Sequence, residues 1–290
     1  MTIIKDFFAD KLHVMVFDTR EAMGRKAGEQ AAARIRELLA EKEEINIIFA
    51  AAPSQNETLE TLVSAEGIDW ARVNAFHMDE YVGLDAAHPA GFRNYLKRTV
   101  FDRLPLGSVN LINGNAENPE EEARRYGQLL AEHPADICLL GVGENGHLAF
   151  NDPPVADFND PVFAKVVKLE EKCRLQQVHD GCFEEIGQVP GYAITVTIPG
   201  LTAARSMFCS VPAATKAEAV RVMYHRARVP LWDCVRMMSL TPASIMGLAD
   251  QVGSIMPGKT ANLISFDEDI RVNGVMVQGS VVFGSFGAGK

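Results

Sequence analysis

Apolar residues along most of the chain form short continuous runs that alternate with longer amphipathic stretches. Continuous runs between turn residues are typical of strands buried on both faces of a parallel sheet, and a 3.6-residue period indicates helices. The repeated order of strand and helix predicts a doubly wound, mostly parallel α/β sheet. The predicted strands span 11–17, 45–52, 73–77, 109–112, 137–140, 162–169, 192–199 and 206–211. The predicted helices begin near residues 18, 57, 91, 119, 170 and 215.

The pattern changes after about residue 228. A helical stretch leads there into a Pro-Gly turn at 257–258 and two apolar runs, which predict strands at 261–266 and 275–282. We therefore expect an α/β domain over residues 1–230 and a small appendage of a helix and β-strands over 231–290.

Composition narrows the class of protein. The chain has 290 residues, of which 47% are hydrophobic and 23% charged, as in ordinary globular proteins. Its net charge of -10 argues against nucleic acid or an anionic membrane as a partner. The five cysteines have no paired spacing, the first residues do not resemble a leader peptide, and no run reaches membrane-span length. We expect a cytoplasmic protein with reduced thiols.

Residues 137–154 carry the first candidate site. The strand at 137–140 is followed by a loop with three glycines, which presents His147 where ligands bind in parallel sheets. Histidine titrates near neutral pH, and Asn145 or Asp152 lies near enough in sequence to orient its ring. The alternative is an ordinary glycine turn with a surface histidine.

Two carboxylates follow the third strand. Asp79 and Glu80 end an apolar segment, and either is a candidate base for proton transfer. Acidic residues at strand ends also commonly cap helices or lie in solvated turns. The pattern alone does not choose between these roles.

Two further segments offer groups for an anion such as phosphate. Lys216 lies in the first turn of a predicted helix, where the helix dipole disfavours a cation unless an anion is bound. The alternative for this residue is a plain surface lysine. The other candidate groups stand at the start of the predicted helix near residue 57 and are Ser54, Gln55 and Asn56. Their alternative role is that of an ordinary helix cap.

Three ordered motifs carry a resemblance to a known family. MDEYVGL (78–84), LINGNA (111–116) and GVGENGHLAFNDP (141–153) resemble the glucosamine-6-phosphate deaminase/isomerase family, which is related to 6-phosphogluconolactonases. The similarity runs from about Val14 to Arg228. It implies a Rossmann-like fold and a reaction that opens an aminosugar phosphate ring, isomerises the sugar and releases ammonia. It implies no metal or redox cofactor.

The resemblance also implies roles for particular residues. Asp79 would move a proton between C2 and C1 of the open-chain sugar, and His147 would protonate the ring oxygen during ring opening. The acidic residues Glu144 and Asp152 would hold the histidine, and Lys216 would bind the phosphate.

The sequence departs from the family pattern at both sites. Asn145 replaces the usual Asp before the Gly-His pair, and Asp152 replaces the usual Glu, so His147 should be less basic unless Glu144 or Asp152 compensates. The phosphate loop at 54–57 lacks the glycines of the usual Thr-Gly-Gly-Thr, and the family's phosphate arginine has no clear counterpart.

The segment 235–284 resembles a different family, the C-terminal end of amidohydrolases such as N-acetylglucosamine-6-phosphate deacetylase. It contains no histidine and lacks the barrel that carries the metal, so we expect no deacetylase chemistry from it. A gene fusion and a truncated remnant with a structural role are both consistent with it.

The expected function is thus an aldose-ketose isomerase/deaminase acting on a small aminosugar phosphate, without cofactor, with a homo-oligomer as a further expectation. Two alternatives remain: a sugar-phosphate-binding or regulatory protein with weakened catalysis, and a lactonase-like hydrolase of a sugar phosphate.

Overall fold

The computed structural model describes residues 3–9, 12–143, 147–152, 154–211, 263–266, 272–277 and 280–284. The chain divides into two compact units, Met1–Pro212 and Ala213–Lys290, and each is described here by itself. The predicted helix near residue 215 lies outside the described residues, as do Glu144, Asn145 and Lys216. The predicted domain boundary near residue 230 stays a prediction.

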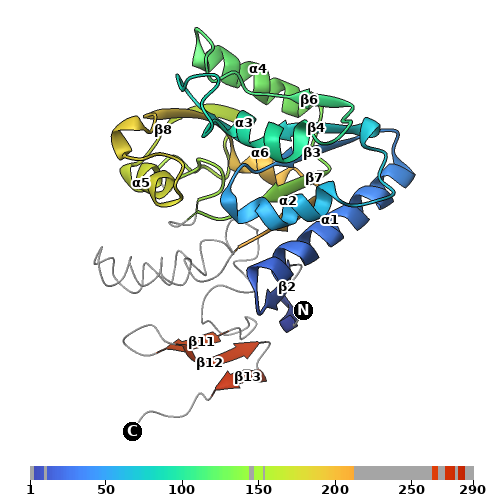
Figure 1. The fold of residues 1–290 in the computed structure, drawn as a ribbon. Coiled ribbons are helices and arrows are strands. Elements are labelled where there is room, and N and C mark those ends of the chain that lie inside the picture. The colour runs from blue at the N-terminus through green and yellow to red at the C-terminus, as the bar shows by residue number, and fades with distance from the viewer. Residues whose placement is uncertain are drawn as a thin grey trace. The chain divides into compact units, whose positions relative to one another are not determined.

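A five-stranded parallel sheet forms the centre of the first unit, with strand order β10-β7-β3-β4-β6 (Figure 1). The chain adds strands first on one side of β3 and then on the other, so the strand order reverses between β3 and β7. The predicted α/β class with a mostly parallel sheet is confirmed. The strands are β3 (Ile45–Phe49), β4 (Val73–His77), β6 (Ser108–Asn110), β7 (Ile137–Leu140) and β10 (Ser206–Cys209).

Helices cover both faces of this sheet (Figure 1). Successive side chains of a strand point to opposite faces, so Ile47 of β3 packs in one apolar cluster and Ile48 in the other. This two-sided burial is why β3 reads as a continuous apolar run. One face carries α1 (Arg20–Glu41), α2 (Asn56–Val63) and α3 (Phe92–Leu96) with its π-helical continuation Lys97–Phe101. The other carries α4 (Pro119–Glu132) and α6 (Ile198–Thr202).

The N-terminal segment contains a strand that the sequence analysis did not predict. β1 (Ile3–Ala9) pairs antiparallel with β2 (Leu12–Phe17), the strand predicted at 11–17. The apolar residues of β1 occur in adjacent pairs and follow neither the helical nor the strand period. Asp18 and Thr19 are both possible caps of the long helix by sequence, and Thr19 is the one that caps it, since its Oγ1 accepts a hydrogen bond of 3.1 Å from the Ala22 N–H.

A second sheet of three antiparallel strands lies beyond β4. Its order is β5-β9-β8, and the acidic residues after β4, which lie outside every predicted strand, form β5 (Asp79–Tyr81). Edge pairing with β9 (Tyr192–Val196) draws these polar residues into a strand. The remaining elements of the first unit are β8 (Ala164–Lys168), α5 (Glu171–His179) and the 3₁₀ turns Pro53–Gln55, Trp70–Arg72 and Ile186–Gln188.

The second unit contains three described strands, β11 (Leu263–Phe266), β12 (Val272–Val277) and β13 (Ser280–Gly284), paired antiparallel in that order. The first predicted strand at 261–266 is confirmed. The second, predicted as one strand at 275–282, is wrong, because Val277 and Ser280 belong to two different strands that pair antiparallel with each other.

Tyr126 joins α4 to β4 directly before the candidate site. Its buried hydroxyl donates to the His77 carbonyl at 2.8 Å and accepts from the His77 N–H at 3.0 Å. We expect Tyr126→Phe to lower the free energy of unfolding by about 1–3 kcal/mol, because it removes the partner of two buried backbone groups. Urea unfolding measures this. The control Tyr192→Phe, at a side chain 52% exposed, should change stability by less than about 0.5 kcal/mol. Equal effects of the two variants would contradict this role.

Candidate active site

Three loops leave the sheet from neighbouring strands. β4, β3 and β7 are adjacent and parallel, so their carboxyl ends lie at one edge of the sheet. Neighbouring strands are about 4.8 Å apart, which places the ends of β4 and β7 on the order of 10 Å from each other. The segments that follow these strands carry Asp79 in β5 after β4, Ser54 after β3 and His147 after β7. The topology therefore gathers these three of the residues that the sequence analysis selected.

Strand β9 anchors two of these loops together. Asp79 of β5 pairs with Thr195 of β9. The Thr195 hydroxyl accepts a hydrogen bond of 3.0 Å from the Phe150 N–H, three residues after His147. The Asn151 amide also donates to the Val196 carbonyl at 2.8 Å. The carboxylate segment and the histidine loop are thus held on the same two residues of one strand.

His147 and Asp152 form the predicted pair. The Nδ1 atom of His147 lies 3.1 Å from Oδ1 of Asp152, and the two side chains are 9% and 1% exposed. Gly143 closes the loop by donating its N–H to the His147 carbonyl at 2.9 Å. A Cβ at position 143 would lie 2.2 Å from the imidazole, so only glycine allows this approach. The carboxylate fixes which imidazole nitrogen faces the protein.

Asp79 is a buried carboxyl without a stabilising partner. It is 7% exposed and makes no hydrogen bond or ion pair with other residues in the described part of the chain. Burial raises the pKa of Asp79 well above its usual range, and the charge of Glu80 raises it further. A carboxyl with a raised pKa is a better general base near neutral pH than an ordinary aspartate.

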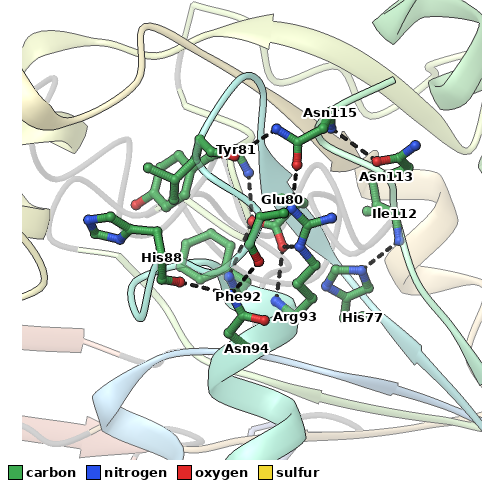
Figure 2. Close-up of polar contacts among 12 residues, drawn as sticks. His77, Glu80, Tyr81, His88, Phe92, Arg93, Asn94, Ile112, Asn113 and Asn115 are labelled. Carbon is green, nitrogen blue, oxygen red and sulfur yellow. Dashed lines mark hydrogen bonds and ion pairs between the residues drawn. The ribbon is translucent and has the colours of Figure 1, made fainter. Parts of the chain in front are cut away.

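Glu80 has a different role, shown in Figure 2. Its carboxylate accepts hydrogen bonds from the backbone N–H groups of Tyr81 (3.0 Å), Phe92 (3.2 Å) and Arg93 (2.9 Å). The Arg93 guanidinium lies 3.7 Å away. A carboxylate on the first N–H groups of a helix satisfies them and complements the helix dipole. Of the two acids that the sequence left open, Glu80 caps α3 and Asp79 remains available for chemistry.

Cys173 on α5 is a site residue that the sequence analysis missed. It is 1% exposed, and its thiol hydrogen-bonds with Asp152. Burial raises the pKa of the Cys173 thiol, followed by the charge of Asp152, their hydrogen bond and the charge of Asp79. Cys173 therefore lies within electrostatic reach of both site carboxyls. A single cysteine without paired spacing gave no signal in the sequence.

The loop after β3 packs directly against the loop after β7. The Gln55 amide is fully buried and donates to Ser54 Oγ (3.2 Å) and to the Leu140 (3.2 Å) and Ser210 (3.5 Å) carbonyls. This bonding uses the Gln55 side chain to join the ends of β7 and β10, which does not favour the phosphate contact expected for it. Asn56 is exposed and accepts a hydrogen bond from the Tyr95 hydroxyl.

A parallel sheet bears, near its switch point, a buried carboxyl that no described residue pairs with and an imidazole held by a carboxylate. This combination defines an α/β enzyme of acid–base chemistry. The sequence profile of the family "Glucosamine-6-phosphate isomerases/6-phosphogluconolactonase" matches residues 18–239, and the chain belongs to this family. The profile of the amidohydrolase family matches residues 200–282.

Relatives in sequence are named glucosamine-6-phosphate deaminase. One from Exiguobacterium sp. (strain ATCC BAA-1283 / AT1b) is 32% identical over 199 residues, which are 68% of this chain and 72% of the relative. One from Bacillus cereus (strain G9842) is 37% identical over 154 residues, which are 53% of this chain and 57% of the relative. The match thus spans little more than half the length of the Bacillus relative.

Solved structures share the fold. A monomeric glucosamine-6-phosphate deaminase superposes with a TM-score of 0.63 at 29% identity, covering 72% of this chain and 85% of that one. The 6-phosphogluconolactonase from Plasmodium vivax gives a TM-score of 0.62 at 16% identity, covering 84% and 88%, which shows the fold alone. Within the described residues, no helix has both the length and the apolar content to cross a membrane.

The buried Asp79 carboxyl should make stability depend on pH. Its pKa is raised on folding. Below the unfolded pKa the carboxyl is protonated in both states and does not change the free energy of unfolding. As pH rises from there through the folded pKa, ionisation of the buried carboxyl lowers the free energy of unfolding. We expect Asp79→Asn to raise the Tm by roughly 2–4 °C at pH 8 and to leave it nearly unchanged at pH 4. Calorimetry at both pH values tests this. The exposed control Asp69→Asn should show no such difference.

Gly143→Ala should displace the His147 ring. Contacts between heavy atoms are optimal at about 3.5–4.0 Å, so the new methyl group moves the imidazole by at least about 1 Å. We expect displaced NMR signals of the His147 imidazole in this variant. Gly191→Ala is the control, because a Cβ there meets no atom within 4 Å. Imidazole signals that stay in place in Gly143→Ala would show that the close approach is not maintained in solution.

Proposed function

We propose that this protein converts glucosamine 6-phosphate, or a closely related aminosugar phosphate, to fructose 6-phosphate and ammonia. The observation that carries the proposal is that strand β9 holds two segments together. It pairs with β5, which bears the buried Asp79 carboxyl, and its Thr195 hydroxyl anchors the loop that contains the Asp152–His147 pair. The family membership and the names of the relatives support it.

The chemistry needs two separate proton-transfer groups. In the proposed mechanism His147 protonates the ring oxygen while the C1 hydroxyl loses its proton, so the bond between C1 and the ring oxygen breaks and leaves the C1 aldehyde. Asp79 then removes the C2 proton and returns it to C1, while one amine proton moves to the C1 oxygen. The product is a C2 imine beside a C1 hydroxyl. Water adds to this imine and ammonia leaves, giving the ketose. Holding one carboxylate beside two adjacent carbons removes the entropic cost of bringing base and substrate together.

Substrate binding is proposed for the loop after β3. Ser54 and Asn56 are the candidates for the phosphate, with Lys216 added from the family resemblance. Gln55 positions Ser54 through its amide. The local cation Arg20 is held by Glu57 at 2.8 Å, so a phosphate here would compete with that carboxylate. Action in the cytoplasm and assembly into a homo-oligomer belong to the same proposal; bacterial relatives named for a metabolic reaction support the former.

A coupled assay for ammonia release from glucosamine 6-phosphate tests the proposal. We expect turnover in the wild type and a loss in kcat of about 10²–10⁴-fold for Asp79→Asn, the usual contribution of a general acid–base group. His147→Gln should slow ring opening to a similar degree. The matched control Asp69→Asn lies on the surface and should keep wild-type kcat.

The same variants separate the alternatives. Binding of sugar phosphates without turnover by the wild type would favour a binding or regulatory protein. Hydrolysis of a sugar-phosphate lactone that survives Asp79→Asn would favour a lactonase, since lactone hydrolysis needs a base toward water and no proton shuttle between carbons.

A further inference from the structure

Three different metal-ligating atoms meet beneath the histidine loop. His147, Asp152 and Cys173 each offer one ligand atom, and these atoms lie within 4.8 Å of one another. Asp152 and Cys173 are 0% and 1% exposed. From this juxtaposition we propose that the His147–Asp152–Cys173 cluster is a binding site for Zn²⁺ or a similar soft divalent cation, and that the bound cation inhibits the enzyme.

The geometry suits a tetrahedral ion with little rearrangement. Zn²⁺ binds nitrogen and oxygen at about 2.0–2.2 Å and sulfur at about 2.3 Å, so neighbouring ligand atoms are separated by roughly 3.2–3.8 Å. The His147 and Asp152 atoms are already 3.1 Å apart, and the other separations need to close by about 1 Å at most. Three protein ligands leave the fourth position for water or an anion.

The donor set selects the metal. Thiolate and imidazole favour zinc-like ions over magnesium or calcium, which prefer oxygen ligands alone. On binding, the Cys173 thiol loses its proton to solvent, and its sulfur forms a bond to the metal in place of the hydrogen bond with Asp152. A thiolate, a carboxylate and a neutral imidazole then balance the dication, so the buried cluster carries no net charge.

Inhibition follows from what the cation displaces. It takes the Nδ1 atom of His147 away from Asp152, which is the contact that orients the imidazole. This part of the inference rests on the proposed function. The binding part does not, because it concerns only the three side chains and the ion.

Cobalt titration of the full-length protein tests binding without any assay of activity. We expect Co²⁺ to produce one equivalent of thiolate-to-metal absorption in the near ultraviolet with the visible bands of a tetrahedral ion, and Zn²⁺ to displace it. Cys173→Ala should abolish the thiolate band. Asp152→Asn should keep the band and weaken affinity at least tenfold. The control Cys182→Ala, at the half-buried thiol beyond the end of α5, should bind like the wild type.

Each outcome decides the matter. Absence of the thiolate band in the wild type, or its persistence in folded Cys173→Ala, overturns the site. If Cys173→Ala does not fold, the tenfold loss in Asp152→Asn decides the assignment. In the ammonia assay, Zn²⁺ should lower wild-type turnover at least tenfold, with recovery on adding a chelator. Metal binding with unchanged turnover overturns the inhibition, and a protein without turnover overturns the proposed function while the cobalt result still stands.

Discussion

Parallel pairing of β4, β3 and β7 is the constraint on which the candidate site depends. Each strand is buried on both faces, so its register is fixed by two apolar clusters, one on each side of the sheet. Because the strands point the same way, the loops that follow them start from one edge. Asp79, Ser54 and His147 are brought together by the sheet although 93 residues separate the first and last of them in sequence. The sheet therefore determines which side chains meet before any contact between them forms.

Much of this arrangement was predictable from the chain alone. The strand at 73–77 and the strand at 137–140 were predicted with the bounds that the structure shows, as was the start of the helix at 119. All three have strong local signals: continuous apolar runs for the strands, and Asn118 followed by Pro119 and three glutamates for the helix start. His147 and its partner Asp152 were also predictable, since glycines after a buried strand marked their loop.

The second sheet was not predictable as a unit. β5 contains Asp79 and Glu80, which have low strand propensity, and it becomes a strand only because β9 supplies a partner far along the chain. The position of Cys173 has the same origin, since it lies on α5 while Asp152 and Asp79, whose charges act on its thiol, come from distant segments of the chain. Non-local pairing and packing leave little trace in local periodicity, so the residues that complete the site emerge only in the folded structure.

The contrast between Asp79 and Glu80 shows how the fold assigns chemical roles to adjacent identical functional groups. Alternation along β5 directs neighbouring side chains to opposite faces, so the two carboxyls enter different surroundings. Burial raises the pKa of Glu80, but at the N-terminus of α3 three backbone N–H groups and Arg93 stabilise its charge and oppose that rise. Burial, followed by the charge of Glu80, raises the pKa of Asp79, and no hydrogen bond from the described residues opposes that rise. A capped carboxylate is a poor base because its lone pairs are occupied, whereas an unpaired one gains most from taking a proton. Burial of the Asp79 carboxyl lowers the stability of the protein, and through the raised pKa it also suits Asp79 to moving a proton between two carbons.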